Sequence, residues 1–170
     1  MRILVVDDNI AVRSIVKRGL RSAGIDLSDV AEAGTGLEAL HCLRARPFDL
    51  VLSDLNMPQL NGLELLAVIR QEAIPVAFGL LTVECEGDGL REDALRAGAN
   101  FVMAKPFTMD HFREAIASVR RLRLDPAWLG PSSSARLEEP SRFRRPAPPA
   151  ETDARDAFVP GGFASLDDVT

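Results

Sequence analysis

The chain has 170 residues and a formal net charge of −5, with 46 % apolar and 26 % charged residues, as in soluble globular proteins. The acidic balance argues against nucleic-acid or anionic-membrane binding, since both require a cationic surface. No apolar run reaches the ~18–20 residues of a transmembrane helix, and the N-terminus lacks the apolar region of a secretory signal. Cys42 and Cys85 form no CxxC pair, so we expect a cytoplasmic protein with reduced thiols.

Prolines divide the chain into two segments of unlike composition. Four lie in residues 1–123 and seven in residues 124–170, where no helical or strand periodicity is sustained. Such a segment buries too little apolar surface to offset the entropy of ordering it. We therefore predict one folded domain over residues 1–123 and a proline-rich, disordered tail over residues 124–170.

Strand and helix patterns alternate from the N-terminus onward. The apolar run at residues 3–6 predicts a strand, and apolar residues at helical spacing predict a helix from residue 10, capped by Asp8 or Asn9, to a stop at Gly24. The later elements are a weak strand at 29–33, a helix through 37–43, a buried strand at 48–53, a helix at 62–70, a strand at 75–81, a helix at 90–97, a strand at 101–103 and a helix that starts at Thr108.

Five strand–helix units in about 120 residues predict an α/β fold with a parallel sheet between two layers of helices. Right-handed crossovers leave few topologies, and we expect the flavodoxin-like (βα)5 sandwich with strand order 2-1-3-4-5. Within the helix at 62–70, spacing indicates that Leu63, Leu66 and Ile69 or Ala67 face inward. A functional site in this fold lies beyond the carboxyl ends of the strands.

Polar residues stand at four of these strand ends: Asp7 and Asp8, then Asp54, Thr82 and Lys105. Two carboxylates about 5 Å apart repel by roughly 3 kcal/mol at an effective dielectric of about 20, so the group must bind a cation, take up a proton or stay apart. An all-oxygen set favours Mg²⁺ over Zn²⁺. Together with a lysine and a hydroxyl, it suits phosphoryl transfer, with Asp54 as nucleophile.

Each of these residues also has an ordinary structural interpretation. An acid that follows a strand often caps the next helix, and a single lysine usually contacts solvent. Their joint placement at four strand ends is what favours a functional site.

With these residues in place, residues 1–123 resemble the receiver domain of two-component response regulators. The matching pieces, in chain order, are Val6-Asp7-Asp8-Asn9, Asp54-Leu55-Asn56-Met57-Pro58 with Gly62, Leu81-Thr82, and Lys105-Pro106-Phe107. The stretch Asp-x-x-Met-Pro-x-x-x-Gly is specific to that family, and the ordered set is more specific still.

The resemblance implies a role for each matching residue. Asp54 would accept a phosphoryl group from a phosphohistidine on a sensor histidine kinase or a phosphotransfer protein, and Lys105 would pair with Asp54 and then with its phosphate. Asp8, Asp54 and the main-chain carbonyl of Asn56 would bind Mg²⁺, with Asp7 acting through water. The chain would catalyse only its own phosphorylation and dephosphorylation.

The resemblance also implies a switch and a partner surface. Thr82 would move toward the phosphoryl oxygens and carry the signal to the face formed by the fourth helix, fifth strand and fifth helix. That face would contact a downstream protein or a second copy of the chain.

Two positions depart from the family pattern. The switch position three residues before Lys105 holds Val102 instead of an aromatic residue, and Phe101 is expected on the other face of that strand. The position after Thr82 holds Val83 where the family usually has a smaller residue, which would narrow access to Asp54.

Three functional hypotheses follow. The first is a stand-alone response regulator that signals through protein contacts, of the chemotaxis type that Asn56 and Glu84 resemble. The second, a haloacid-dehalogenase-type phosphatase, requires Asp-x-Asp at one strand end, whereas Asp54 is followed by Leu55 and Asn56. The third is a pseudo-receiver scaffold that acts without phosphorylation.

Overall fold

The computed structural model describes residues 1–83 and 89–122. At its centre lies a five-stranded parallel sheet in the order β2-β1-β3-β4-β5, as the sequence predicts. The strands are β1 (Ile3–Val6), β2 (Val30–Ala33), β3 (Leu50–Asp54), β4 (Ala77–Thr82) and β5 (Phe101–Ala104). The helices are α1 (Ile10–Ser22), the short 3-10 helix η1 (Leu27–Asp29), α2 (Gly36–Ala45), α3 (Gly62–Gln71), α4 (Leu90–Arg96) and α5 (Met109–Leu122).

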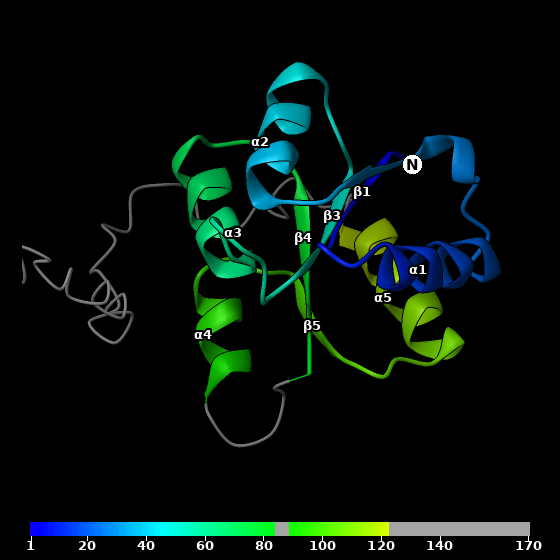
Figure 1. Ribbon diagram of the computed structural model, residues 1–170. Coiled ribbons are helices and arrows are strands. Elements are labelled where there is room, and N and C mark those ends of the chain that lie inside the picture. The colour runs from blue at the N-terminus through cyan, green and yellow to red at the C-terminus, as the bar shows by residue number, and fades with distance from the viewer. Residues whose placement is uncertain (84–88, 123–170) are drawn as a thin grey trace, which may run out of the picture. The chain divides into compact units, whose positions relative to one another are not determined.

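Helices cover both faces of the sheet, with α2, α3 and α4 on one side and α1 and α5 on the other (Figure 1). Side chains alternate along a strand, so Leu4 and Val6 pack toward the first layer while Ile3 and Val5 pack toward the second. Because both faces are covered, the central strands read as continuous apolar runs. This burial on two sides is what made the strands recognisable in the sequence.

Side-chain caps fix where the helices that follow the strands begin. The Asn9 side chain accepts a hydrogen bond from the Ala11 amide and so caps α1. Thr35 caps α2 in the same way. At α3, Asn61 and Glu64 form a reciprocal capping box. These caps satisfy amide groups in the first turn of each helix and so fix where the helix begins.

The inward face of α3 differs in part from the prediction. Leu66 and Ile69 are buried as expected, but Leu65 is buried as well, Leu63 is only partly buried, and Ala67 is exposed. The helix is apolar at nearly every position from 63 to 69, so its spacing alone does not select one face. Packing against β4 and α2 makes that selection.

The helix predicted at 90–97 ends at Arg96, and Ala97 is exposed. Ala97 forms the C-cap, so its side chain leaves the face on which Ala94 is buried.

The chain divides into two units, Met1–Arg136 and Leu137–Thr170, and all described residues belong to the first. The domain boundary predicted at residue 123 and the disorder predicted for the tail lie outside the described residues and stay predictions. No helix in the described part of the chain is both long and apolar enough to span a membrane.

Candidate functional site

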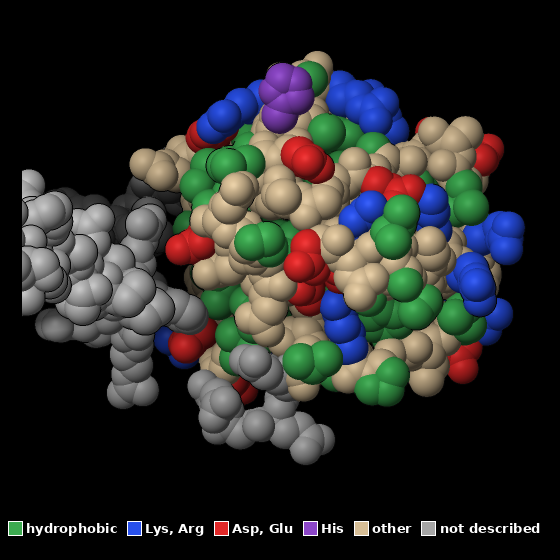
Figure 2. All heavy atoms as spheres, in the orientation of Figure 1, with side chains coloured by type: hydrophobic (Ala, Val, Ile, Leu, Met, Phe, Trp, Pro, Cys, Tyr) green, Lys and Arg blue, Asp and Glu red, His purple; other side chains and the backbone are tan. Residues whose placement is uncertain are grey.

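The carboxyl ends of four parallel strands bring the predicted polar residues to one edge of the sheet. Asp7 directly follows β1, Asp54 and Thr82 are the last residues of β3 and β4, and Lys105 follows β5. The first three are nearly or fully buried, with exposed fractions of 2 % for Asp7, 8 % for Asp54 and 0 % for Thr82. We call these four residues the strand-end site. In Figure 2, acidic side chains gather near the middle of the visible face.

A single ammonium group joins the two carboxylates of the strand-end site. The Nζ atom of Lys105 lies 2.8 Å from Oδ2 of Asp7 and 2.7 Å from Oδ1 of Asp54. One positive charge therefore serves two negative charges, so the cluster retains an excess of negative charge. Such a cluster favours a further cation.

The second oxygen of each carboxylate is held by its own turn. Oδ1 of Asp7 accepts a hydrogen bond from the Asn9 amide at 2.9 Å, and Oδ2 of Asp54 accepts one from the Asn56 amide at 3.0 Å. Both are local Asx-type bonds from a residue two positions later. Both oxygens of each carboxylate are thus held, one by Lys105 and the other by a main-chain amide of the loop that follows the strand.

Burial and charge shift the ionisation of the central pair. Burial raises the pKa of the Asp54 carboxyl group; the bond from Lys105 offsets this only in part, and the charge of Asp7 raises the pKa further. Burial alone would lower the pKa of Lys105, but its hydrogen bonds to Asp54 and Asp7 outweigh that effect and raise it. Lys105 therefore stays cationic, while the ionised form of Asp54 is disfavoured relative to water.

A close backbone approach positions Asp54. The Gly62 amide donates to the Leu55 carbonyl at 2.9 Å, and a Cβ atom at Gly62 would lie 2.3 Å from the Asp54 carbonyl oxygen. Only glycine allows α3 to begin this near the end of β3. The glycine of the sequence motif therefore has a direct steric reason.

The loop after β5 is tied to β4 through the main chain. The Lys105 amide donates to the Thr82 carbonyl at 2.7 Å, and the Lys105–Pro106 peptide bond is cis. The next residue after Thr82 is Val83, which is 66 % exposed. Glu84 and Cys85 lie outside the described residues.

The remaining predicted ligands lie at the surface of the site. Asp8 and Asn56 are both exposed, each two residues beyond the last residue of a strand. Within residues 1–83 and 89–122, no three His, Cys, Asp or Glu side chains are grouped so as to hold a metal ion. A cation here would be bound by two carboxylates together with main-chain and water oxygens, which is the donor set that Mg²⁺ accepts.

Strand alternation separates Phe101 from the switch position, as the sequence predicts. Val102 packs in the layer of α2, α3 and α4, whereas Phe101 packs in the layer of α1 and α5. Phe101 leans over Gly79, where a Cβ atom would lie 2.3 Å from its ring. The Phe101 ring therefore lies on the opposite face of the sheet from Val102, and it does not fill the space that an aromatic side chain at position 102 would occupy.

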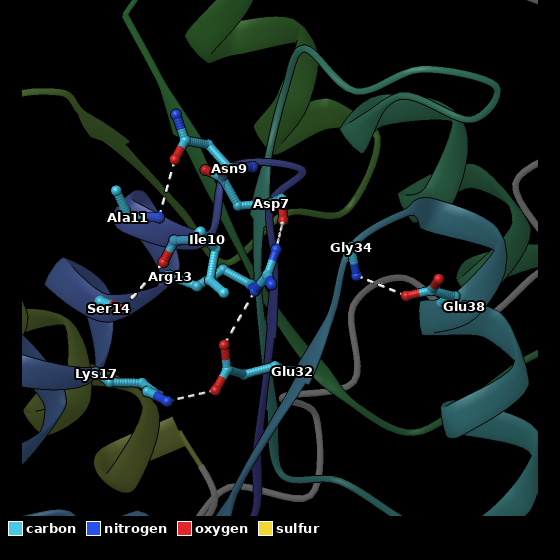
Figure 3. A network of polar contacts seen from close by, with 10 residues as sticks. All are labelled: Asp7, Asn9, Ile10, Ala11, Arg13, Ser14, Lys17, Glu32, Gly34 and Glu38. Carbon is cyan, nitrogen blue, oxygen red and sulfur yellow. Dashed lines mark hydrogen bonds and ion pairs between the residues drawn. The ribbon is translucent and has the colours of Figure 1, made fainter.

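Sequence reasoning missed one residue that contacts the backbone of the site. Arg13 in α1 donates from Nη1 to the Asp7 carbonyl at 2.7 Å (Figure 3). No signal in the sequence identified this contact or the second partner of Arg13, Glu32 on β2.

Comparisons with known proteins agree with this geometry. A family model described as the response regulator receiver domain matches residues 3–117. The chemotaxis protein CheY of Pseudomonas aeruginosa is 37 % identical over 123 residues, which cover 70 % of this chain and 95 % of that protein.

Two solved structures are similar as well. The receiver domain of the Francisella response regulator 1452 gives a TM-score of 0.64 at 26 % identity, over 71 % of this chain and 97 % of that one. The chemotaxis response regulator CheY4 of Vibrio cholerae gives a TM-score of 0.60 at 29 % identity, over 69 % and 97 %. With its strand order and its family match, the chain belongs to the response regulator receiver domain family of two-component signalling.

Proposed function

We propose that the chain is a phosphorylation-dependent response regulator whose phosphoacceptor is Asp54. The observation that carries this proposal is the shared Lys105 ammonium, 2.7 Å from Asp54 and 2.8 Å from Asp7 at the carboxyl edge of the sheet. This arrangement offers a carboxylate nucleophile with a cation beside it. The phosphodonor is a phosphohistidine on a sensor kinase or a phosphotransfer protein.

The transfer exchanges one bond to phosphorus for another. The free lone pair of an Asp54 carboxylate oxygen attacks the phosphorus, a P–O bond forms as the P–N bond of the phosphohistidine breaks, and the departing imidazole keeps the electron pair and takes up a proton. Lys105 then pairs with the phosphoryl oxygens. Its hydrogen bonds to Asp54 and Asp7 raise the pKa of Lys105, so this group is cationic when the transfer begins.

The donor atoms around Asp54 fit Mg²⁺. The ligands in this proposal are the carboxylates of Asp8 and Asp54 and the main-chain carbonyl of Asn56, with Asp7 acting through water. All are oxygen atoms, and two carboxylates are a usual number for this ion. When bound, Mg²⁺ supplies charge neutralisation for the phosphoryl group in transfer.

The signal passes from Thr82 and Lys105 to the face formed by α4, β5 and α5. A new dianion on Asp54 attracts the Thr82 hydroxyl and the Lys105 ammonium, which biases the conformation of the elements that carry them. Val102 replaces the aromatic switch of the family, so Thr82 carries more of the coupling. The output is contact with a downstream protein in the cytoplasm, of the chemotaxis type, or pairing of two copies through this face, without nucleic acid or membrane insertion.

A scaffold that works without phosphorylation is the weaker alternative. The departures from the family pattern at Val83 and Val102 would favour such a scaffold. A scaffold, however, does not require Asp7 and Asp54 to be buried around one lysine. Burying two carboxylates carries a desolvation cost that a scaffold has no reason to retain. Partner binding unchanged by Asp54→Asn would favour the scaffold.

Phosphorylation by a small donor tests the proposal. The full chain is incubated with acetyl phosphate and Mg²⁺ and its intact mass is measured. We expect a gain of about 80 Da, the mass of one phosphoryl group, in the wild type and none in Asp54→Asn or without Mg²⁺. The absence of a gain in the wild type with any phosphodonor would contradict the proposal.

A further inference from the structure

A chain of charged side chains joins α1 to the edge strand β2 beside the strand-end site. Arg13 and Lys17 lie one turn apart on α1, and both contact the carboxylate of Glu32 in β2 (Figure 3). Nε of Arg13 donates to Oε2 of Glu32 at 3.0 Å, and Lys17 pairs with Oε1. We call Arg13, Lys17 and Glu32 the Arg13 network.

The Arg13 network reaches the site through one hydrogen bond. While Nε of Arg13 binds Glu32, its Nη1 donates to the Asp7 carbonyl oxygen at 2.7 Å, and the side chain is only 15 % exposed. The guanidinium is therefore held at both of its edges. Lys17 helps to hold Glu32 in place, because each carboxylate oxygen of Glu32 contacts a different cation: Oε2 contacts Arg13 and Oε1 contacts Lys17.

The bonded carbonyl belongs to the peptide group that links Asp7 to Asp8. The two dihedral angles that flank this planar peptide set how the Asp7 and Asp8 side chains are oriented relative to each other, because the peptide itself does not rotate. The Asp7 carboxylate has to reach Lys105 at 2.8 Å and the Asn9 amide at 2.9 Å simultaneously. A rotation about either flanking dihedral angle would turn the Asp7 and Asp8 side chains relative to one another.

We propose that Arg13 is a positioning residue for the acidic turn, which orients Asp7 toward Lys105 and Asp8 toward the cation. Glu32 holds Arg13 in place, so β2, the one strand of the sheet whose end supplies no residue to the site, contributes through the Arg13 network. The inference rests on the proposed function for its cation, and it assigns no chemical step to Arg13.

Arginine suits this task better than lysine. Its planar fork presents Nε and Nη1 donors in a fixed relation, so one side chain can bind a carboxylate and a carbonyl in different directions. An ammonium on a flexible stem at position 13 would hold one of the two partners well. Arg13→Lys should therefore restore only part of the effect.

Mg²⁺ binding to the full chain provides the test, measured by isothermal titration calorimetry for wild type, Arg13→Gln, Arg13→Lys, Glu32→Gln and Arg18→Gln. Arg18 lies on the exposed surface of the same helix and is the matched control. Replacing a residue that orients a metal ligand typically weakens metal affinity by about 10–100-fold. For this more distant contact we expect the Kd for Mg²⁺ to rise about threefold to tenfold in Arg13→Gln. Glu32→Gln should weaken binding less, and Arg18→Gln should not change it.

A spectroscopic readout separates positioning from general loss of structure. Mg²⁺ added to the ¹⁵N-labelled chain should shift the Asn9 and Asn56 amide signals in the wild type. In Arg13→Gln the Asn9 signal should already differ without Mg²⁺, while the Phe78 amide at the sheet core stays unchanged. A Phe78 signal that moves as much as that of Asn9 would indicate a structural role and overturn the inference.

The outcomes distinguish this inference from the function on which it rests. Mg²⁺ binding in the wild type that Arg13→Gln leaves unchanged would overturn the positioning role alone. A wild-type chain that takes up no Mg²⁺ would overturn the proposed function and the inference together. Weaker binding in Arg13→Gln with partial recovery in Arg13→Lys would support both.

Discussion

At the scale of single residues, the site depends on one cation placed between two acids. Lys105 donates hydrogen bonds to both Asp7 and Asp54, and these two acids have exposed fractions of only 2 % and 8 %. Removing any one of the three changes the charge balance of the other two.

Replacing Asp54 by Asn should stabilise the metal-free protein, because burial raises the pKa of this carboxyl group in the folded state. Below the ordinary pKa of an aspartate both states are protonated and the variant gains nothing. As the pH rises through the ordinary pKa and then the raised one, the ionised carboxylate costs the wild type stability. The advantage of Asp54→Asn should grow over this range and then level off.

Urea unfolding in EDTA at several pH values checks this dependence. The exposed acid Asp110, in the first turn of α5, supplies the matched control Asp110→Asn. A wild type that gains stability relative to Asp54→Asn as the pH rises would show that the sign is wrong.

Replacing Lys105 by Met should destabilise the protein, since it leaves two nearly buried carboxylates without their shared cation. Breaking a buried pair costs about 3–5 kcal/mol, and because Lys105 is 16 % exposed we expect about 2–3 kcal/mol. Adding Asp54→Asn to this variant should recover part of the loss. The control Lys17→Met, at a pair that is about one third exposed, should cost under about 1 kcal/mol. Equal losses in the two single variants, measured by urea unfolding, would contradict this account.

At the scale of elements, the junction of β3 and α3 and the attachment of α4 to β5 matter most. The first is tight because α3 starts against the Asp54 carbonyl. The attachment of α4 to β5 buries little apolar surface, because Ala94 is the buried residue of α4 and Leu95 is 40 % exposed. One junction therefore fixes Asp54, the proposed phosphoacceptor, while the other leaves α4 easier to shift.

Replacing Gly62 by Ala should disturb both stability and the site. The new Cβ atom would meet the Asp54 carbonyl oxygen at 2.3 Å, and overpacking of this kind costs about 1–3 kcal/mol. We expect a lower urea midpoint and slower phosphorylation by acetyl phosphate. The control Gly34→Ala, where the nearest atom is 3.5 Å away, should be neutral in both assays. A Gly62→Ala variant that matched the wild type in both measurements would exclude this steric role.

Replacing Arg91 by Gln should loosen α4. Nη1 of Arg91 donates to the Val102 carbonyl at 3.1 Å and ties the helix to β5 at the switch position. Losing a hydrogen bond worth about 1 kcal/mol corresponds to about fivefold faster amide exchange in α4, measured by mass spectrometry. Arg96→Gln, which removes an exposed pair with Asp93, is the control. Exchange in α4 that was equal in the two variants would argue against the attachment.

At the scale of the whole molecule, the sequence predicts the fold well because both faces of the sheet are covered. Continuous apolar runs at β1, β3 and β4 identify the central strands, and parallel topology then places Asp7, Asp54, Thr82 and Lys105 at one edge. The inward face of α3 was predicted only in part, because the helix carries apolar side chains of its own on nearly every side. Neighbouring elements, and not its own spacing, select Leu65.

The contact between Arg13 and the site was beyond sequence reasoning for a different reason. Its carboxylate partner, Glu32, lies 19 residues later on an edge strand. Which charges pair across two elements depends on their packing distance and register, and neither follows from periodicity.

Chemical trapping of the phosphorylated residue is the most direct test. The full chain is treated with acetyl phosphate and Mg²⁺, the acyl phosphate is reduced with borohydride, and the peptides are mapped by mass spectrometry. The account predicts homoserine in place of Asp54, with Asp7 and Asp8 unchanged. Homoserine at either of those two positions, or at none of the three, would contradict it.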